Sequence, residues 1–387
     1  MPKKILSLIC LFNFMWPGIS EAKLPLELSD VSILFPMPHS NSELLGPDDE
    51  GVYGILLPKE AFQYLPPFES GDSEIYQKLR VVGIRLDPCP ARREISLPCY
   101  PEIRLIWQPL VIANDKISSL DDTVHTFYDL SREEIKEILS TISEYKNLSG
   151  ETFRGFPFLS RYGNPAGIGL GVHPIIQQEG PGGPFAKKLK VEVLNFAGEK
   201  RLKKMTFMRS LGTGIWDFGG FDFNSTGVKA IDIPNINSTR QFFYNSSKKM
   251  TEFLDGGPSP APLSVDTIQI LISDSDKLGT EVTDEIRNAV VATWKIENPR
   301  ITNAHNTDCV SCHTAQPARF WFLGHFSVLQ SEYDFFAFKS KYNLINGSEL
   351  AEKTTRLRAF GYDGNVPVIN QRTINDSARV LEDLEAF

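Results

Sequence analysis

The chain has 387 residues and a formal net charge of −8 at pH 7, with 40 Lys and Arg against 48 Asp and Glu. An acidic chain without basic clusters is a poor partner for nucleic acid or an anionic membrane surface. The composition therefore argues against a nucleic-acid-binding protein and against a protein that binds anionic lipid. The 41% of hydrophobic residues suffices for a sizeable core, and the length suits two domains or one large elaborated domain.

Residues 1–22 have the pattern of a cleavable export signal. Lys3 and Lys4 precede a largely apolar run at residues 5–16, and small residues flank position 21. The pattern predicts a mature chain that begins at Lys23 in the periplasm or another extracytoplasmic compartment. The apolar run is too short for a membrane-spanning helix and no later stretch approaches that length, so we expect no transmembrane segment after signal removal.

The first part of the mature chain has the character of strands. Stretches rich in β-branched and aromatic residues, bounded by Pro, Gly, Asn and Asp, lie at residues 31–35, 51–57, 79–86 and 102–108. A helix is expected next at residues 131–145, because Ser131 and Glu134 form a capping box and apolar residues then recur at helical spacing.

The remaining elements predict an α+β fold. A mainly antiparallel β region at residues 23–262, which contains the helix at 131–145, is followed by a smaller, mainly helical C-terminal region at 263–387. The boundary is the Pro- and Gly-rich stretch at residues 256–262. The other expected elements are helices at 184–196, 283–296, 348–358 and 375–384, and strands at 201–208 and 266–272.

Cys89 and Cys99 lie ten positions apart in a proline-rich loop that would close well as a small ring. Exported proteins seldom leave such thiols free, so we expect a disulfide between them. This assignment leaves Cys309 and Cys312 as the only other cysteine pair of the mature chain.

Residues 309–313, Cys-Val-Ser-Cys-His, form the sequence motif that indicates a specific cofactor. Cys-x-x-Cys-His is the attachment signature of c-type haem, because two thiols three positions apart on one helical turn can both reach the vinyl groups of one porphyrin. His313 then offers an imidazole nitrogen to the iron. Two other uses stay open: a zinc site that recruits His305 or His325, and a redox dithiol, although the sequence lacks a second Cys-x-x-Cys pair and a preceding βαβ pattern.

In this motif the chain resembles the c-type cytochromes. The resemblance covers residues 309–313 and implies one covalently bound haem c, with thioether bonds to Cys309 and Cys312 and with His313 as the proximal iron ligand. Export agrees with it, since haem is attached to these proteins after secretion. The chain departs from small cytochromes c in one respect: they place a methionine downstream as the distal ligand, whereas the last methionine here is Met250.

The second iron ligand is therefore sought elsewhere. His325 is the first candidate, because the aromatic residues around it could wall a haem, and His305 is the second. Met205, Met208 or His173 could reach across from the upstream region, and an open position is the remaining alternative. Candidate partners for the haem propionates are Arg319, Arg356, Arg358 and Arg372.

The expected function is electron transfer by an exported monohaem protein, with a redox partner protein that the sequence does not identify. Whether the chain is an enzyme stays open. One alternative is a haem enzyme or gas sensor, which needs an open iron position. Another is an envelope ligand-binding protein with an accessory haem, since a dedicated electron shuttle needs far less protein than the part of this chain before residue 303.

Overall fold

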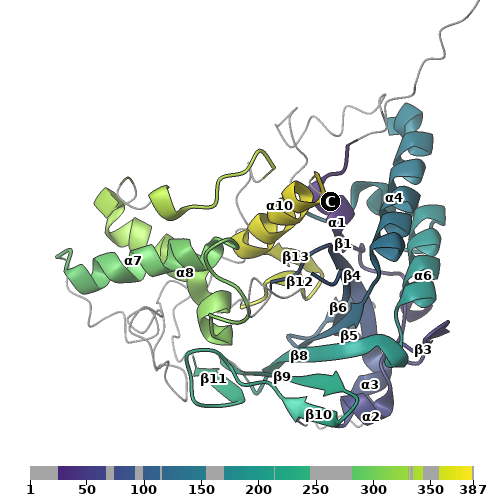
Figure 1. Ribbon diagram of the computed structural model, residues 1–387, viewed down its shortest axis with the longest axis horizontal. Coiled ribbons are helices and arrows are strands. Elements are labelled where there is room, and N and C mark those ends of the chain that lie inside the picture. The colour runs from purple at the N-terminus through teal and green to yellow at the C-terminus, as the bar shows by residue number, and fades with distance from the viewer. Residues whose placement is uncertain are drawn as a thin grey trace, which may run out of the picture.

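The structure is a computed structural model in which helices cover both faces of a large antiparallel sheet (Figure 1). It describes residues 25–66, 74–91, 99–113, 116–153, 170–212, 214–244, 281–329, 331, 334–342 and 357–385. The α+β class expected from the sequence is confirmed, and so is the helical character of the C-terminal region, where α7 and α8 lie.

The main sheet has nine strands in the described part of the chain. They run in the order β1-β4-β5-β7-β8-β9-β10, with β6 beside β5 and β11 beside β9. These strands are β1 (Ser32–Leu34), β4 (Leu79–Asp87), β5 (Glu102–Ala113), β6 (Lys116–Ser119), β7 (Thr123–Asp129), β8 (Leu202–Ser210), β9 (Ile215–Asn224), β10 (Gly227–Ala230) and β11 (Arg240–Tyr244). Two short hairpins lie outside it: β2 (Glu50–Gly51) with β3 (Gly54–Ile55), and β12 (Phe360–Asp363) with β13 (Val366–Ile369).

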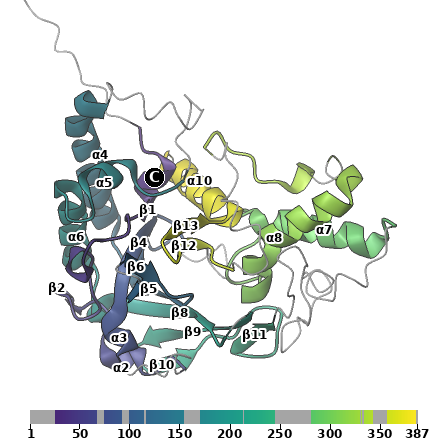
Figure 2. The same ribbon diagram turned by 180° about the vertical axis from the view of Figure 1, so that it is seen from behind.

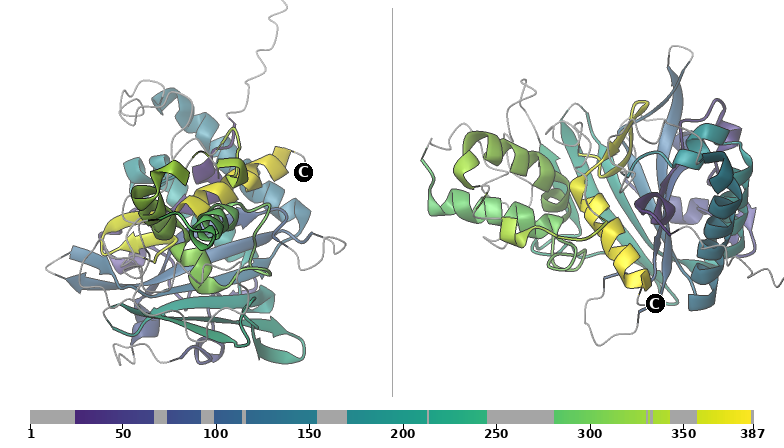
Figure 3. Two further views of the ribbon diagram at one scale, coloured as in Figure 1. Left: turned by 90° about the vertical axis from the view of Figure 1, so that its left-hand side faces the viewer. Right: turned by 90° about the horizontal axis from the view of Figure 1, so that it is seen from above.

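The helices flank this sheet on two sides (Figure 2). They are α1 (Leu28–Val31), α2 (Lys59–Phe62), α3 (Ile75–Lys78), α4 (Arg132–Phe153), α5 (Pro174–Glu179), α6 (Pro184–Phe196), α7 (Asp284–Glu297), α8 (Cys309–His325) and α10 (Gln371–Glu385). Helices α4 and α6 lie on one side, and α7 and α8 lie on the other, with α10 between them and the sheet (Figure 3, right).

One face of the sheet is apolar and packs against α4 and α6. On β5 and β7 this face carries Leu105, Trp107, Val124 and Tyr128, which are all fully buried. The apolar stripes of α4 and α6 belong to the same core. Because side chains alternate along a strand, the residues between these four point to the opposite face.

The opposite face is polar in its centre. Arg85 on β4 pairs with Arg104 on β5. On the next strand, β7, His125 pairs with Ile106 of β5 and lies on the same polar face. The β12–β13 hairpin covers part of this face, since the side chain of Gln108 donates to the backbone carbonyl of Tyr362 at 2.9 Å. Helix α10 and the start of α8 cover the rest, so residues distant in the chain meet here.

Most expected elements are present with shifted ends. The helix expected at 131–145 continues to residue 153 as α4, and α6, α7 and α10 form where helices were expected. The stretch at 51–57 is not one strand: the chain turns at residues 52–53, and Gly54, with a φ of 92°, begins β3. Four predicted segments lie outside the described residues: the signal at 1–22, the connector at 256–262, the strand at 266–272 and most of the helix at 348–358.

The C-terminal elements share a core with the N-terminal region. Phe360, Tyr362 and Ile374 belong to the same buried cluster as the apolar face of the sheet. The domain boundary expected at residue 262 falls outside the described residues and stays a prediction. Within the residues that are described, no helix combines the length and apolarity needed to cross a membrane.

A disulfide joins Cys89 and Cys99, whose Cα atoms are 4.9 Å apart. It closes the loop between β4 and β5. The loop also contacts α10, because a guanidinium nitrogen of Arg379 donates to the carbonyl of Cys89 at 3.3 Å and another pairs with the Asp87 carboxylate at 2.5 Å. The crosslink therefore lies where the C-terminal helix meets the sheet.

Candidate functional site

The Cys-x-x-Cys-His stretch forms the first turn of α8. Asp308 is the N-cap residue, and its Oδ1 accepts a hydrogen bond from the backbone N–H of Ser311 at 2.9 Å. Gln241 on β11 donates to the same oxygen at 2.8 Å and accepts from the backbone N–H of Val310 at 3.0 Å. Because Asp308 and Gln241 are fully buried, β11 determines where α8 starts and how it is oriented.

Cys309 and Cys312 lie three positions apart on this turn, so their side chains share one face of the helix. Both are free cysteines, and both are partly buried. Burial raises the pKa of each thiol, and the nearby Asp308 carboxylate raises the pKa of Cys309 further. The pair is therefore protonated at neutral pH, unlike the activated thiolate of a redox dithiol.

The imidazole of His313 is held in a defined orientation. Its Nδ1–H donates to the backbone carbonyl of Leu357 at 2.5 Å, and its ring centroid lies 5.0 Å from that of Phe218 on β9. Burial lowers the pKa of His313, so the ring is neutral at pH 7. With the proton on Nδ1, the lone pair of Nε2 is the one that can bind a metal ion.

The polar face of the sheet brings a further histidine, His125, towards this turn. Its position follows from the alternation along β7, in which Val124 and Tyr128 point into the apolar core and His125 points the other way. Burial lowers the pKa of His125 well below its ordinary value, and the positive charge of Arg104 lowers it further. The alternation along this strand is visible in the sequence. However, a single histidine in a strand does not reveal which distant residues it will lie beside.

The two histidines first considered as second ligands lie away from His313. His325 is exposed at the other end of α8, where its ring stacks on Trp321 with centroids 4.1 Å apart. At a helical rise of about 1.5 Å per residue, it is roughly 18 Å along the axis from His313. His305 is also exposed, and its Nε2 hydrogen-bonds to the carbonyl of Ala91 at 3.1 Å.

The three upstream residues considered as second iron ligands, Met205, Met208 and His173, lie on different sides of the sheet. Met205 lies in the core beneath α4 and α6, and His173 is buried with Nε2 at 3.3 Å from the Asp30 carboxylate. Met208 pairs with Phe218 across β8 and β9, and it belongs to a separate buried apolar cluster that also contains residues of α8, such as Val310 and Phe322. Of these three residues, Met208 is the one on the side of His313.

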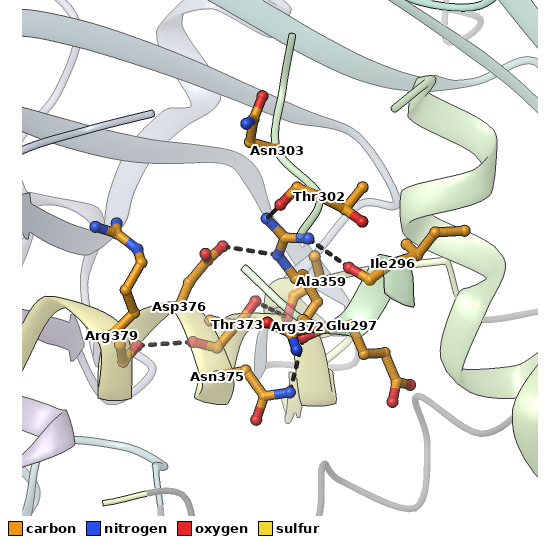
Figure 4. Close-up of polar contacts among 12 residues, drawn as sticks. Ile296, Glu297, Thr302, Asn303, Ala359, Arg372, Thr373, Asn375, Asp376 and Arg379 are labelled. Carbon is orange, nitrogen blue, oxygen red and sulfur yellow. Dashed lines mark hydrogen bonds and ion pairs between the residues drawn. The ribbon is translucent and has the colours of Figure 1, made fainter. Parts of the chain in front are cut away.

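Arg372 on α10 holds the connection between α7 and α8 (Figure 4). It donates to the carbonyl of Ile296, where α7 ends, and to the carbonyl of Thr302 at 2.7 Å. Its Nε also donates to the Asp376 carboxylate at 3.2 Å. Arg372 also lies near Cys312. Burial raises the pKa of the Cys312 thiol, and the positive charge of Arg372 offsets a part of this increase.

The other candidate propionate partners also have contacts within the protein. Arg319 donates to Glu297 at 2.7 Å, and both are buried. Arg358 donates to Asp121 at 2.5 Å, and its buried side chain lies against the residues at the start of β7. Arg356 lies outside the described residues.

Comparison with known proteins returned no match: no family model, no curated protein and no solved structure is significantly similar to this chain. Among the residues that the structure describes, no group of three or more His, Cys, Asp or Glu side chains is arranged to hold a metal ion. The functional argument therefore depends on the geometry around α8.

Proposed function

We propose that the chain is an exported monohaem protein of the c-type cytochrome kind, in which Cys309 and Cys312 bind haem c covalently and His313 is the proximal iron ligand. One observation carries the proposal: the Nδ1–H of His313 is bonded to the Leu357 carbonyl. Metal-bound histidines typically use their second ring nitrogen in this way. Two free thiols and one neutral imidazole on a single helical turn are the donor set that haem attachment requires.

Zinc and dithiol chemistry fit the same turn less well. A zinc site needs two further ligands beside the two thiols, which zinc deprotonates when it binds. The histidines that zinc would recruit, His305 and His325, are exposed and hold other contacts. A redox dithiol needs a thiol pKa below the ordinary value, whereas burial raises the pKa of both thiols.

The proposed role is electron transfer with a partner protein outside the cytoplasm. Haem supplies one-electron redox chemistry when bound. The chain's own residues orient the site: Asp308 and Gln241 fix the first turn of α8, and the Leu357 carbonyl holds the imidazole of His313. The aromatic side chain of Phe218 packs on that imidazole and limits its contact with water.

A haem enzyme or gas sensor is the second candidate function. It is favoured by the position of His325, which lies roughly 18 Å along α8 from His313 and so is poorly placed to close the iron coordination. Binding of carbon monoxide to the reduced protein distinguishes the two functions, because a closed two-ligand shell resists it and an open position accepts it.

Covalent attachment is tested with the full-length chain, including its leader, in a bacterial host that attaches haem to exported proteins. We expect haem to remain on the protein in a denaturing gel, and Cys309→Ala or Cys312→Ala to abolish or severely reduce it. His325→Ala is the matched control on the same helix and should retain haem. Stoichiometric zinc without covalent haem would refute the proposal.

Export is tested with the same preparation. The proposal expects the protein in the periplasmic fraction with Lys23 as its first residue, as determined by N-terminal sequencing. Retention of residues 1–22 on a cytoplasmic protein would contradict the export step and, with it, the compartment in which haem is attached.

A further inference from the structure

A short series of contacts connects His313 to the strand that carries His125. His313 donates to the carbonyl of Leu357, and the next residue, Arg358, donates to the hydroxyl of Thr123 at the start of β7. Thr123 and His125 are two positions apart on that strand, so their side chains leave the sheet on the same face, about 7 Å apart. The segment at residues 357–358 therefore contacts the His313 imidazole through Leu357 and reaches β7 two positions from His125 through Arg358.

The register of the sheet gives the same placement independently. Phe218, which packs on His313, pairs with Met208 on β8, and Met208 pairs with Thr123 on β7. His313 thus lies over this row of the sheet. His125 belongs to the next row on the same face, which also contains Thr206 and Gly220, so it lies one row along the strands from the residues beneath His313.

His125 is chemically available for a ligand. In the described part of the chain its ring nitrogens make no hydrogen bond, and its ring contact is with Phe127, at a centroid distance of 6.5 Å. The side chain keeps part of its accessible surface.

We propose that His125 is the second axial ligand of the haem iron, opposite His313. The inference rests on the function proposed above and replaces His325, which lies at the far end of α8. Two imidazole ligands close the coordination of the iron, and this favours electron transfer over binding of gases. Met208 is the competing ligand on the same face, and it would give the iron a thioether in place of an imidazole.

The test compares the purified haem-loaded full chain with four single variants: His125→Ala, Met208→Leu, His325→Ala and Thr206→Ala. We expect the wild type, Met208→Leu and His325→Ala to be low-spin in the ferric state and to leave the ferrous spectrum unchanged under carbon monoxide. His125→Ala should become high-spin and bind carbon monoxide to full occupancy. Thr206→Ala, on the neighbouring strand of the same row, is the control for a small cavity in the sheet and should behave as wild type.

Added imidazole separates loss of a ligand from loss of the fold. His125→Ala protein with wild-type haem content should return to the low-spin spectrum when free imidazole fills the vacated space. A wild type that binds carbon monoxide, or a His125→Ala protein that stays low-spin, overturns the inference while covalent haem still supports the proposed function. Absence of covalent haem from the wild type overturns both.

Discussion

The Nδ1 atom of His313 lies 2.5 Å from the carbonyl oxygen of Leu357, although 44 positions separate the two residues. A carbonyl oxygen can only accept a hydrogen bond, so Nδ1 carries the proton and Nε2 carries the lone pair. Because the acceptor belongs to the main chain, no side-chain substitution at position 357 removes it. The orientation of the imidazole depends instead on what holds this backbone segment in place.

Arg358 is the residue that holds it, and its loss is the first prediction. The buried guanidinium donates to Asp121 and to the hydroxyl of Thr123. Arg358→Met should lower the free energy of unfolding by about 2 to 3 kcal/mol, because it removes a buried guanidinium that bonds to the buried Thr123 and to the partly exposed Asp121. Urea denaturation of the unloaded chain measures this loss.

The haem-loaded Arg358→Met protein should also show a changed iron spectrum at unchanged covalent haem content, since the His313 acceptor has moved. Arg300→Met is the matched control, because Arg300 is an exposed arginine that pairs with Glu382 on α10. It should alter stability by less than about 1 kcal/mol. Equal effects of the two variants would show that Arg358 does not position the segment.

The second prediction concerns Gln241, which joins β11 to the start of α8. Gln241→Leu fills a similar volume but leaves the backbone N–H of Val310 without its acceptor, and it leaves the buried Asp308 carboxylate with the Ser311 N–H as its remaining donor. We expect a loss of about 1 to 3 kcal/mol in unfolding free energy, which is the cost of one buried group left without a hydrogen bond. Denaturation of the unloaded chain measures it, and the yield of covalent haem should fall in parallel.

Gln241→Ala tests whether the lost hydrogen bonds or the lost volume is responsible. If polar contacts dominate, water can enter the space that alanine leaves and satisfy Asp308, so Gln241→Ala should be no more destabilised than Gln241→Leu. A Gln241→Leu protein with wild-type stability would mean that β11 does not determine the start of α8.

The class of fold was predictable because local patterns are strong in this chain. The capping box of Ser131 and Glu134 forms as expected, with the Ser131 hydroxyl accepting from the Glu134 N–H at 3.1 Å and the Glu134 carboxylate accepting from the Ser131 N–H at 2.7 Å. Strand composition likewise marked β4 and β5. The ends of elements were less predictable: α4 continues to residue 153, because tertiary contacts decide where a helix stops.

The candidate site was predictable in part. The thiols and His313 form one contiguous motif, so local spacing revealed them. His125, Gln241 and Leu357 come from three distant parts of the chain, and strand register and packing bring them to α8. His325 attracted attention because of its aromatic neighbours, yet those rings pack on one another at the far end of the helix. Proximity in sequence does not imply a shared face on a helix of this length.

The third prediction separates the two cysteine pairs. Replacing Cys89 and Cys99 together with serine should lower the unfolding free energy by about 2 to 3 kcal/mol, the value expected for a crosslink that closes a loop of this size. Covalent haem should be retained, because Cys309 and Cys312 are untouched. The reduced wild type is the control: reductant should lower its stability to that of the double variant and leave the double variant unchanged. Loss of haem from the double variant would contradict the assignment.

The last prediction follows from Asp376, the carboxylate on α10 that Arg372 contacts. Burial alone would raise its pKa, but Arg372, Arg85 and Arg379 outweigh burial and lower it from 3.8 to about 2. A carboxyl whose pKa is lower in the folded state stabilises the fold above its unfolded pKa, and this contribution disappears as the pH falls through the folded value. Asp376 should therefore contribute about 2 kcal/mol above pH 4 and almost nothing near pH 2.

Urea denaturation at a series of pH values measures this contribution as the difference between wild type and Asp376→Asn. The difference should be about 2 kcal/mol at pH 7 and should shrink steadily between pH 4 and pH 2, because the wild-type carboxyl then binds a proton and resembles the amide. Glu382→Gln removes a more peripheral carboxylate from the same helix, where it pairs with the exposed Arg300, and should cost less than about 1 kcal/mol. A constant difference across the whole pH range would show that Asp376 acts through packing and hydrogen bonding, not through its charge.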